Sequence, residues 1–336
     1  MASIRDVAKL AGVSITSVSR VLNNDKTFII PEETREKIQK AIQELNYRIP
    51  DSYVKNSPTK FSVGCIQRLT VEGNKDNYFT TIVSGVKQHL SKHGKSLQFL
   101  FTQLDFETND YENIFQTYPK GLIIMGDISK EAYNFLKSKI KYIVGIDTSY
   151  DDIDNIRYNR FEAGIEAVEY LIKCGHKKIA YIGSNINLHN HKNIGRYEAY
   201  RRVMYANNLE INPEWIIDSK WHRDTCFEET IKLLQSNNRP TAIFVASDYM
   251  AIAAMSAIHS VGLNVPEDIS VIAISDIVES AYLTPPLTTI SIPQKDMGKI
   301  ASEVLLQRIN GDTTLKKQIF VPCKLIIRNS VKKISE

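Results

Sequence analysis

A short run near the N-terminus carries side chains that can bond to the edges of nucleic-acid bases. Ile15 and Thr16 offer methyl groups and a hydroxyl, and Arg20 offers a guanidinium one helical turn further on. An arginine fork can bond guanine O6 and N7, and a methyl group can contact the methyl of thymine. These three side chains can act together only if one helix presents them on a common face.

The residues around this run predict such a helix, with a second helix packed against it. Apolar residues recur at helical spacing in both halves of the segment from Ser3 to Leu22: Ile4, Val7, Ala8 and Ala11, then Val18, Val21 and Leu22. Gly12 permits the left-handed backbone of a sharp turn, and Ser14 can cap the second helix. A helix, turn and helix of this kind can place the start of the second helix in the major groove of DNA.

Short polar side chains around the second helix suit contacts with phosphate oxygens, which fix register without reading sequence. They are Ser3, Ser14, Ser17, Ser19 and Asn23. Residues 1–60 contain ten Lys or Arg against seven Asp or Glu, a net charge of +3, whereas the other 276 residues contain 32 against 31. Because this excess is modest, we expect a two-fold dimer that grips two half-sites. The alternative is a small helical hairpin whose Arg20 is merely solvated.

A third helix completes the predicted head, residues 1–46. Pro31 to Leu45 begins with proline and two glutamates and continues with an apolar stripe, as a helix would. Residues 47–60 contain two prolines and two serines without sustained periodicity, which indicates a linker.

The remaining residues, 61–332, predict a larger α/β core. Short apolar runs alternate with amphipathic helical stretches: SVGCI near 62, SLQFLF near 96, GLIIMG near 121, YIVGID near 142, KIAYIG near 178, TAIFVA near 241 and ISVIAIS near 269. Alternating strands and helices form parallel sheets covered on both faces. This length exceeds one comfortable hydrophobic interior, so we expect two doubly wound lobes that meet at a cleft.

Composition excludes several classes of protein. No run of eighteen apolar residues occurs and no apolar signal segment opens the chain, so we expect a cytoplasmic protein with no membrane partner. The four cysteines lie far apart without a C-x-x-C pair, which favours free thiols over disulfides or zinc. His189 and His191 could hold a metal, but their Asn-rich surroundings are typical of a solvated loop. We predict no metal and no cofactor.

Several motifs together resemble the lactose repressor and galactose repressor family over essentially the whole chain. They are DVAKLAGVS, SVSRVLN, TREKI, LNY, GHKKIAYIG, DISV and PPLTTI. The resemblance implies an all-α helix-turn-helix head joined to a two-lobed, periplasmic-binding-protein-like core with parallel doubly wound sheets. One lobe would comprise 61–159 with 292–320, and the other 160–291 with 321–332. It also implies a homodimer on double-stranded operator DNA, with a small effector between the lobes.

The family pattern also assigns effector-binding positions. The corresponding residues here are Tyr78, Asp147, Arg196, Trp221, Ser247, Ser275 and Asp276. A carboxylate and a guanidinium can each bond adjacent sugar hydroxyls, and an indole can stack on the sugar ring. The segments FVASDYMAIAA, PPLTTISIP and VPCKLIIRNS are most similar to the evolved β-galactosidase repressor and its relatives, which implies a galactoside or another small sugar.

Two positions and the linker depart from the family pattern. Many relatives have Asn where this chain has Ser247, and many have an effector-binding Asp where it has Ser275, so either Asp276 compensates or the effector differs. The linker lacks the usual alanine and leucine, and Val54 or Tyr53 would have to replace the leucine that wedges into the minor groove.

By resemblance, effector binding would release the DNA, although a co-repressor is the alternative. Two other classes of protein share this architecture, namely α/β enzymes and sugar-binding proteins for transport. The sequence contains neither G-x-S-x-G nor G-x-G-x-x-G, so we do not expect an enzyme. A transport protein would need an export signal and no DNA-reading head.

Overall fold

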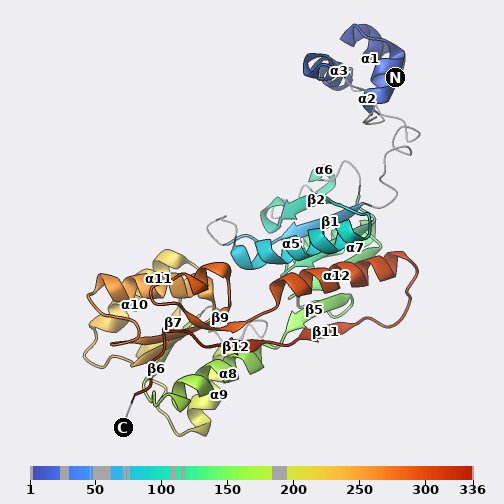
Figure 1. Ribbon diagram of the computed structural model, residues 1–336. Coiled ribbons are helices and arrows are strands. Elements are labelled where there is room, and N and C mark those ends of the chain that lie inside the picture. The colour runs from blue at the N-terminus through green and yellow to red at the C-terminus, as the bar shows by residue number, and fades with distance from the viewer. Residues whose placement is uncertain are drawn as a thin grey trace. The chain divides into compact units, whose positions relative to one another are not determined.

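The computed structural model describes residues 3–22, 30–45, 47, 62–70, 73, 76–106, 111–114, 118–183 and 195–334. The chain divides into two compact units, Met1–Ser62 and Val63–Glu336, which contain the head and the two-lobed core respectively. Figure 1 shows the helices of the head and the two sheets of the core.

Within the described residues, the head contains three helices around a small apolar interior. They are α1 (Ile4–Ala11), α2 (Ile15–Leu22) and α3 (Glu32–Glu44). Ser3 and Asp6 form a reciprocal capping box at the start of α1, and Gly12 ends it in the left-handed region at φ 67°. The predicted cap on α2 is confirmed, because the Ser14 hydroxyl accepts from the backbone N–H of Ser17 at 3.0 Å.

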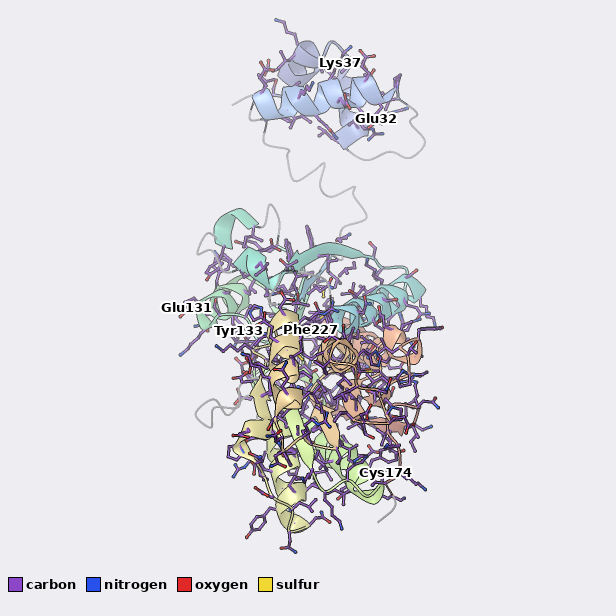
Figure 2. All side chains as sticks on the ribbon, turned by 90° about the vertical axis from the view of Figure 1, so that its left-hand side faces the viewer. Glu32, Lys37, Glu131, Tyr133, Cys174 and Phe227 are labelled. Atoms are coloured by element: carbon purple, nitrogen blue, oxygen red, sulfur yellow. The ribbon has the colours of Figure 1, made fainter. Side chains whose placement is uncertain are left out.

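Side chains from all three helices close the interior of the head. The buried ones are Val7, Ala8, Ala11, Val18, Ile38 and Ala41. The opposite face of α3 is charged, and Lys37 pairs with Glu33 at 2.8 Å. Figure 2 labels Glu32 and Lys37 on this helix. The apolar stripes of the sequence therefore face inward as predicted.

The first lobe of the core is a six-stranded parallel sheet in the order β11-β5-β4-β3-β1-β2. Its strands are β1 (Val63–Gln67), β2 (Leu97–Thr102), β3 (Gly121–Met125), β4 (Tyr142–Ile146), β5 (Asp154–Tyr158) and β11 (Gln318–Val321). Its helices are α5 (Asn77–Lys92), η2 (Gln103–Phe106), α6 (Tyr111–Ile114), α7 (Lys130–Lys139) and α12 (Gln294–Ile309).

The second lobe repeats the architecture in the order β12-β10-β9-β8-β6-β7, with only β12 antiparallel to its neighbour. Its strands are β6 (Ile179–Gly183), β7 (Ile216–Asp218), β8 (Ala242–Val245), β9 (Ser270–Ser275), β10 (Thr288–Ser291) and β12 (Lys324–Ile326). Its helices are α8 (Arg160–Lys173), α9 (Gly195–Ala206), η3 (Pro213–Trp215), α10 (Arg223–Gln235), α11 (Asp248–Ser260) and η4 (Val278–Ala281).

The chain crosses between the lobes three times, after β5, after β10 and after β11. All seven apolar runs singled out in the sequence form strands. The predicted fold class, a helical head with a two-lobed α/β core of mainly parallel sheets, is therefore confirmed.

Helices α5 and α12 lie side by side although roughly 200 residues separate them in the sequence (Figure 1). Glycines allow their backbones to approach. A Cβ placed on Gly298 would meet the Ile82 carbonyl oxygen at 2.1 Å, and one on Gly85 would meet the Lys295 carbonyl oxygen at 2.0 Å. This pair of helices covers one face of the first sheet. At the two glycines the helix backbones meet each other directly, with no side chain between them.

We expect Gly298→Ala to lower the free energy of unfolding by about 1–3 kcal/mol, because the added methyl group would force two backbones apart. Helix propensity alone predicts the opposite sign, since alanine in a helix is favoured over glycine by about 1 kcal/mol. Urea denaturation of the variant would decide between the two effects, with Glu303→Ala on the exposed face of α12 as the control. A more stable Gly298→Ala protein would show that the close approach is not needed.

Candidate DNA-reading surface and effector site

In the head, α2 presents the three candidate base-reading residues to solvent. Thr16 and Arg20 are exposed, and Ile15 keeps 45% of its surface accessible although it is a large apolar residue. Val18, between them in sequence, is fully buried against the other helices. The helix is therefore held by one face while the opposite face is exposed to solvent.

The candidate phosphate-binding serines divide into two groups. Ser3 and Ser14 already act as helix caps, and the Ser3 hydroxyl donates to the Asp6 carboxylate at 2.7 Å. The Ser17 hydroxyl lies within 2.9 Å of the Ser14 hydroxyl, and Ser19 is half-buried. Asn23 and Val54 lie outside the described residues. Capping leaves backbone N–H groups at the start of α2 directed outward, where phosphate contacts commonly form.

In the core, Asp147 lies at the carboxyl end of β4 in a left-handed conformation at φ 55°. Its side chain is only 8% exposed. Tyr78, at the start of α5, donates its hydroxyl to Asp147 Oδ2 at 2.8 Å, and Arg160 Nη2 lies 3.4 Å from Oδ1. Oδ1 itself has no hydrogen-bond partner among the residues described. A buried acceptor with spare capacity is what a ligand hydroxyl would need.

Burial, and then the charge of Asp147, raise the pKa of Tyr78 well above its usual value. Tyr78 therefore remains a neutral hydroxyl donor at any physiological pH. This tyrosine has two roles, because it is a buried aromatic residue at a helix start and also a partner of Asp147.

Arg196 connects the second lobe to the first. Its Nη2 donates to the Tyr158 hydroxyl at the end of β5, and its guanidinium lies 5.7 Å from the centres of both the Tyr158 and Trp221 rings. Arg160 lies over the same Tyr158 ring at 5.7 Å. The Nε atom of Arg196 is buried and, within the described part of the chain, has no hydrogen-bond partner. Cation–π contact thus orients a guanidinium that keeps a free donor.

These contacts connect four of the seven predicted effector residues, Tyr78, Asp147, Arg196 and Trp221. The other three have separate partners. Ser247 caps α11 by accepting from the Met250 N–H, Ser275 is buried at φ 148°, and Asp276 forms an ion pair with Arg328 at 2.6 Å. No hydrogen bond, ion pair or ring contact among the described residues links these three to the first four. Asp276 is already in an ion pair, so its carboxylate is not free.

Sequence reasoning missed the two residues that complete the network, Tyr158 and Arg160. Tyr158 ends the run DNIRY, which forms β5 although it lacks the apolar pattern of the other strands, and Arg160 begins α8. The weak signal was their position just before and at the start of an amphipathic helix, where strand ends and helix starts converge in this fold.

The arrangement offers hydrogen-bond donors and acceptors with one flat aromatic face, which suits binding rather than bond cleavage. No group of three or more His, Cys, Asp or Glu side chains within the described ranges is placed to hold a metal ion.

Comparison with known proteins agrees with this division into head and core. Residues 3–50 match the family described as bacterial regulatory proteins, lacI family, and residues 168–331 match a periplasmic binding protein-like domain. The HTH-type transcriptional repressor PurR of Haemophilus influenzae (strain PittEE) is 36% identical over 347 residues, covering 99% of this chain and all of that protein. The chain belongs to the lacI family. It is a DNA-binding transcriptional repressor and not an enzyme.

Other lacI-family proteins give the same result. PurR of Vibrio vulnificus (strain CMCP6) is 34% identical over the full length of both chains. The lac repressor dimer bound to operator and the anti-inducer ONPF superposes with a TM-score of 0.69 at 26% identity, covering 98% of this chain and 99% of the other. The transcriptional regulator CelR in complex with cellobiose has the same fold, with a TM-score of 0.70 at 23% identity and coverage of 98% and 100%.

These relatives do not establish the galactoside that the sequence motifs implied, because the two repressors that match at 36% and 34% identity are both named PurR. None of the helices described is long and apolar enough to span a bilayer.

Proposed function

We propose that this repressor binds operator DNA as a homodimer through residues 1–46 and is released when a small sugar binds between the lobes of its core. The lobes would comprise 61–159 with 292–320 and 160–291 with 321–332, connected to the head by residues 47–60. A repressor that acts on chromosomal operators would work in the cytoplasm. The observation that carries the sugar assignment is the contact of Arg196 with Tyr158 across the lobes, beside the spare acceptor of Asp147.

The site supports a sugar because its free groups match a ring of hydroxyls. Asp147 Oδ1 and Arg196 Nε are buried polar atoms without hydrogen-bond partners in the described residues, and Trp221 supplies an aromatic face. A buried polar atom left unpaired costs about 1–3 kcal/mol, so a ligand that satisfies both atoms is favoured. Ser247, Ser275 and Asp276 would form the outer part of the same site, with their present partners limiting direct contact.

Release would follow from a coupling between the core, which would bind the effector, and the head, which would bind DNA. Because Arg196 and Tyr158 belong to different lobes, a ligand that contacts both residues would favour one relative arrangement of the lobes. A coupling of about 1–3 kcal/mol would change operator affinity roughly 5- to 150-fold. An electrophoretic mobility-shift titration with a panel of mono- and disaccharides tests this, and a sugar that tightens the complex would contradict release.

The proposed homodimer has support in the second lobe. Val278 and Tyr282, at and just after η4, are large apolar residues that remain exposed, Tyr282 to 81%. Exposed apolar residues that lie close together are typical of protein interfaces. Light scattering of the full chain should give a dimer, and a monomer at micromolar concentration would contradict the half-site argument.

For the head, we propose that Ile15, Thr16 and Arg20 contact bases. Ser17 and Ser19 would contact phosphates, together with Ser3, Ser14 and Asn23, and Val54 would enter the minor groove. We expect Arg20→Ala to cost about 1–3 kcal/mol on the preferred operator and to relax discrimination at one base pair. Binding measurements on an operator and its single-base variants would show this. Lys37→Ala, on the exposed face of α3, removes the same charge and is the matched control. Equal losses on operator and random DNA would assign Arg20 to a phosphate.

A purine co-repressor is the second candidate effector, and the observation that favours it is the set of full-length relatives named PurR. The aromatic rings of Tyr158 and Trp221, which flank Arg196, could also stack on a flat base. The same mobility-shift titration distinguishes the candidates, because a purine that tightens operator binding while sugars have no effect would replace the sugar proposal.

A further inference from the structure

Arg68 lies just after the carboxyl end of β1, and neither the sequence motifs nor the proposed sugar contacts use it. It lies across the end of the neighbouring strand β3, where Gly126 leaves room for it. A Cβ on Gly126 would meet Arg68 Nη1 at 3.1 Å and Cδ at 3.2 Å. The Gly126 N–H in turn bonds to the Ile146 carbonyl beside Asp147. The absence of a side chain at Gly126 therefore lets a guanidinium lie over the carboxyl edge of the sheet.

The acids of this edge are already engaged by other groups. Asp127 accepts from the backbone and hydroxyl of Ser149 at 2.7 and 3.0 Å. Asp147 is held by Tyr78 and Arg160. Asp276, after β9 in the sheet of the other lobe, is paired with Arg328.

Two guanidiniums consequently lack a close counter-charge. Across the described ranges, neither Arg68 nor Arg196 has a carboxylate within 4 Å, although both are partly buried. Burial lowers the pKa of Arg68, Asp127 partly offsets this effect, and Arg160 adds to it. Arg68 and Arg160 are thus close enough to repel each other. A partly buried cation without a partner is costly unless a ligand supplies the anion.

Helix geometry adds to the positive potential. Helix α8 begins at Arg160 and α9 at Gly195, and a Cβ on Gly195 would lie 3.1 Å from the Arg160 Cβ. The two N-terminal ends are therefore adjacent, and each carries partial positive charge. Glu162, in the first turn of α8, is exposed to solvent and so screens this potential only weakly.

We propose that the effector carries an anionic substituent, a phosphate or a carboxylate, bound by Arg68 and Arg160 together with Arg196. This inference rests on the proposed sugar function, since it places the sugar ring beside Trp221 and the anion at the arginines. Guanidinium forks bond both anions in pairs, and such charge-assisted bonds are the stronger kind. A neutral sugar would supply no anion to Arg68, which has no carboxylate within 4 Å among the described residues.

Inorganic phosphate is the first probe, because it isolates the anion from the sugar. Thermal unfolding of the full chain would be followed against phosphate at constant ionic strength, in parallel with Arg68→Gln and the exposed-arginine control Arg239→Gln. We expect Arg68→Gln to need at least a tenfold higher phosphate concentration than the wild type for the same rise in the unfolding temperature of the core. Arg239→Gln should behave as the wild type does. Any phosphate that binds the head does so equally in all three proteins, so its effect on unfolding cancels in the comparison. Equal curves for wild type and Arg68→Gln, or no phosphate effect beyond that of chloride, would overturn the proposal.

Calorimetry with galactose, galactose 6-phosphate, galacturonate and hypoxanthine separates this proposal from the proposed function. Tighter binding of a charged sugar than of galactose by at least tenfold, with the difference lost in Arg68→Gln, supports the anion site and shows whether phosphate or carboxylate is preferred. Galactose binding as tightly as both charged forms would retain the sugar effector and overturn the anion site. Binding of hypoxanthine alone would overturn both.

Discussion

Replacing Arg308 with methionine should lower the free energy of unfolding of the core by about 3–5 kcal/mol, because the buried Asp154 carboxylate would lose its bidentate partner and keep only Lys316 Nζ, 3.8 Å away, as a counter-charge. The Arg308 side chain is 5% exposed and that of Asp154 is fully buried. Their fork closes with Nε–Oδ2 and Nη2–Oδ1 distances of 2.8 and 2.7 Å. Chemical denaturation at neutral pH would measure the loss.

The pH dependence of this loss has a defined sign. Burial alone would raise the pKa of Asp154, but hydrogen bonds from Arg308 and from the Lys317 backbone outweigh it and hold the pKa below its usual value. In the wild type, this contribution is therefore complete above about pH 4 and is lost as the pH falls through the lowered folded-state pKa. In the variant we expect burial to raise the pKa of Asp154 relative to its wild-type value, because the bonds from Arg308 are gone. The difference in the free energy of unfolding between the wild type and the variant should become smaller as the pH falls from about 7 towards 4.

A double variant, Asp154→Asn with Arg308→Met, tests whether the orphaned charge is the cause. It removes the buried carboxylate and should recover a large part of the stability lost in Arg308→Met. If the double variant were as unstable as the single one, the cost would instead come from the bonds of Arg308 to the carbonyls of Thr314 and Leu315.

Arg196→Met should weaken effector binding by about 3 kcal/mol, or roughly a hundredfold, while DNA binding in the absence of effector stays the same. Each hydrogen bond to a charged group contributes about 1.5–3 kcal/mol, and the proposal assigns the guanidinium two ligand oxygens. The change also removes the cation–π contact with Trp221. Titration calorimetry with the effector found in the sugar and purine panels measures the first quantity, and mobility shift without effector measures the second.

Arg201→Met is the matched control, because Arg201 is on the same helix and forms an exposed ion pair with Glu198 at 3.4 Å. It should bind effector as the wild type does. Equal weakening in both variants would indicate a disturbance of α9 as a whole, and unchanged binding in Arg196→Met would remove this residue from the site.

The sequence predicted those parts of the fold that have a strong hydrophobic period. Strands with continuous apolar runs, such as β3 and β9, are buried on both faces and could be recognised individually. Strand β5 could not, because Asp154, Asn155 and Arg157 make it polar. Asp154 bonds to Arg308, 154 residues away, and Asn155 bonds to the loop at Thr148, so neither partner is visible in the local pattern. The short edge strands β7, β11 and β12 lack the length for a periodic signal.

The site was predictable to the extent that it follows strand ends. Asp147 follows an obvious strand, and in the structure it contacts Tyr78 and Arg160. Arg160 and Arg196 share the Tyr158 ring, and Arg196 also contacts Trp221. What the sequence could not show is which polar groups are already paired. The Arg328 partner of Asp276 and the backbone partner of Ser247 come from tertiary geometry, and the same geometry places Arg68 beside a glycine.

The interleaved order of the two lobes also determines how the protein can be made. Residues of α5 emerge from the ribosome long before α12, which packs along them, and Asp154 is synthesised about 150 residues before Arg308. At the usual rates of translation, roughly ten seconds to half a minute pass in which an apolar helix face and a carboxylate wait for their partners. Nascent chains halted before residue 294 should therefore remain aggregation-prone, and chaperone supply during synthesis should limit the yield of this repressor.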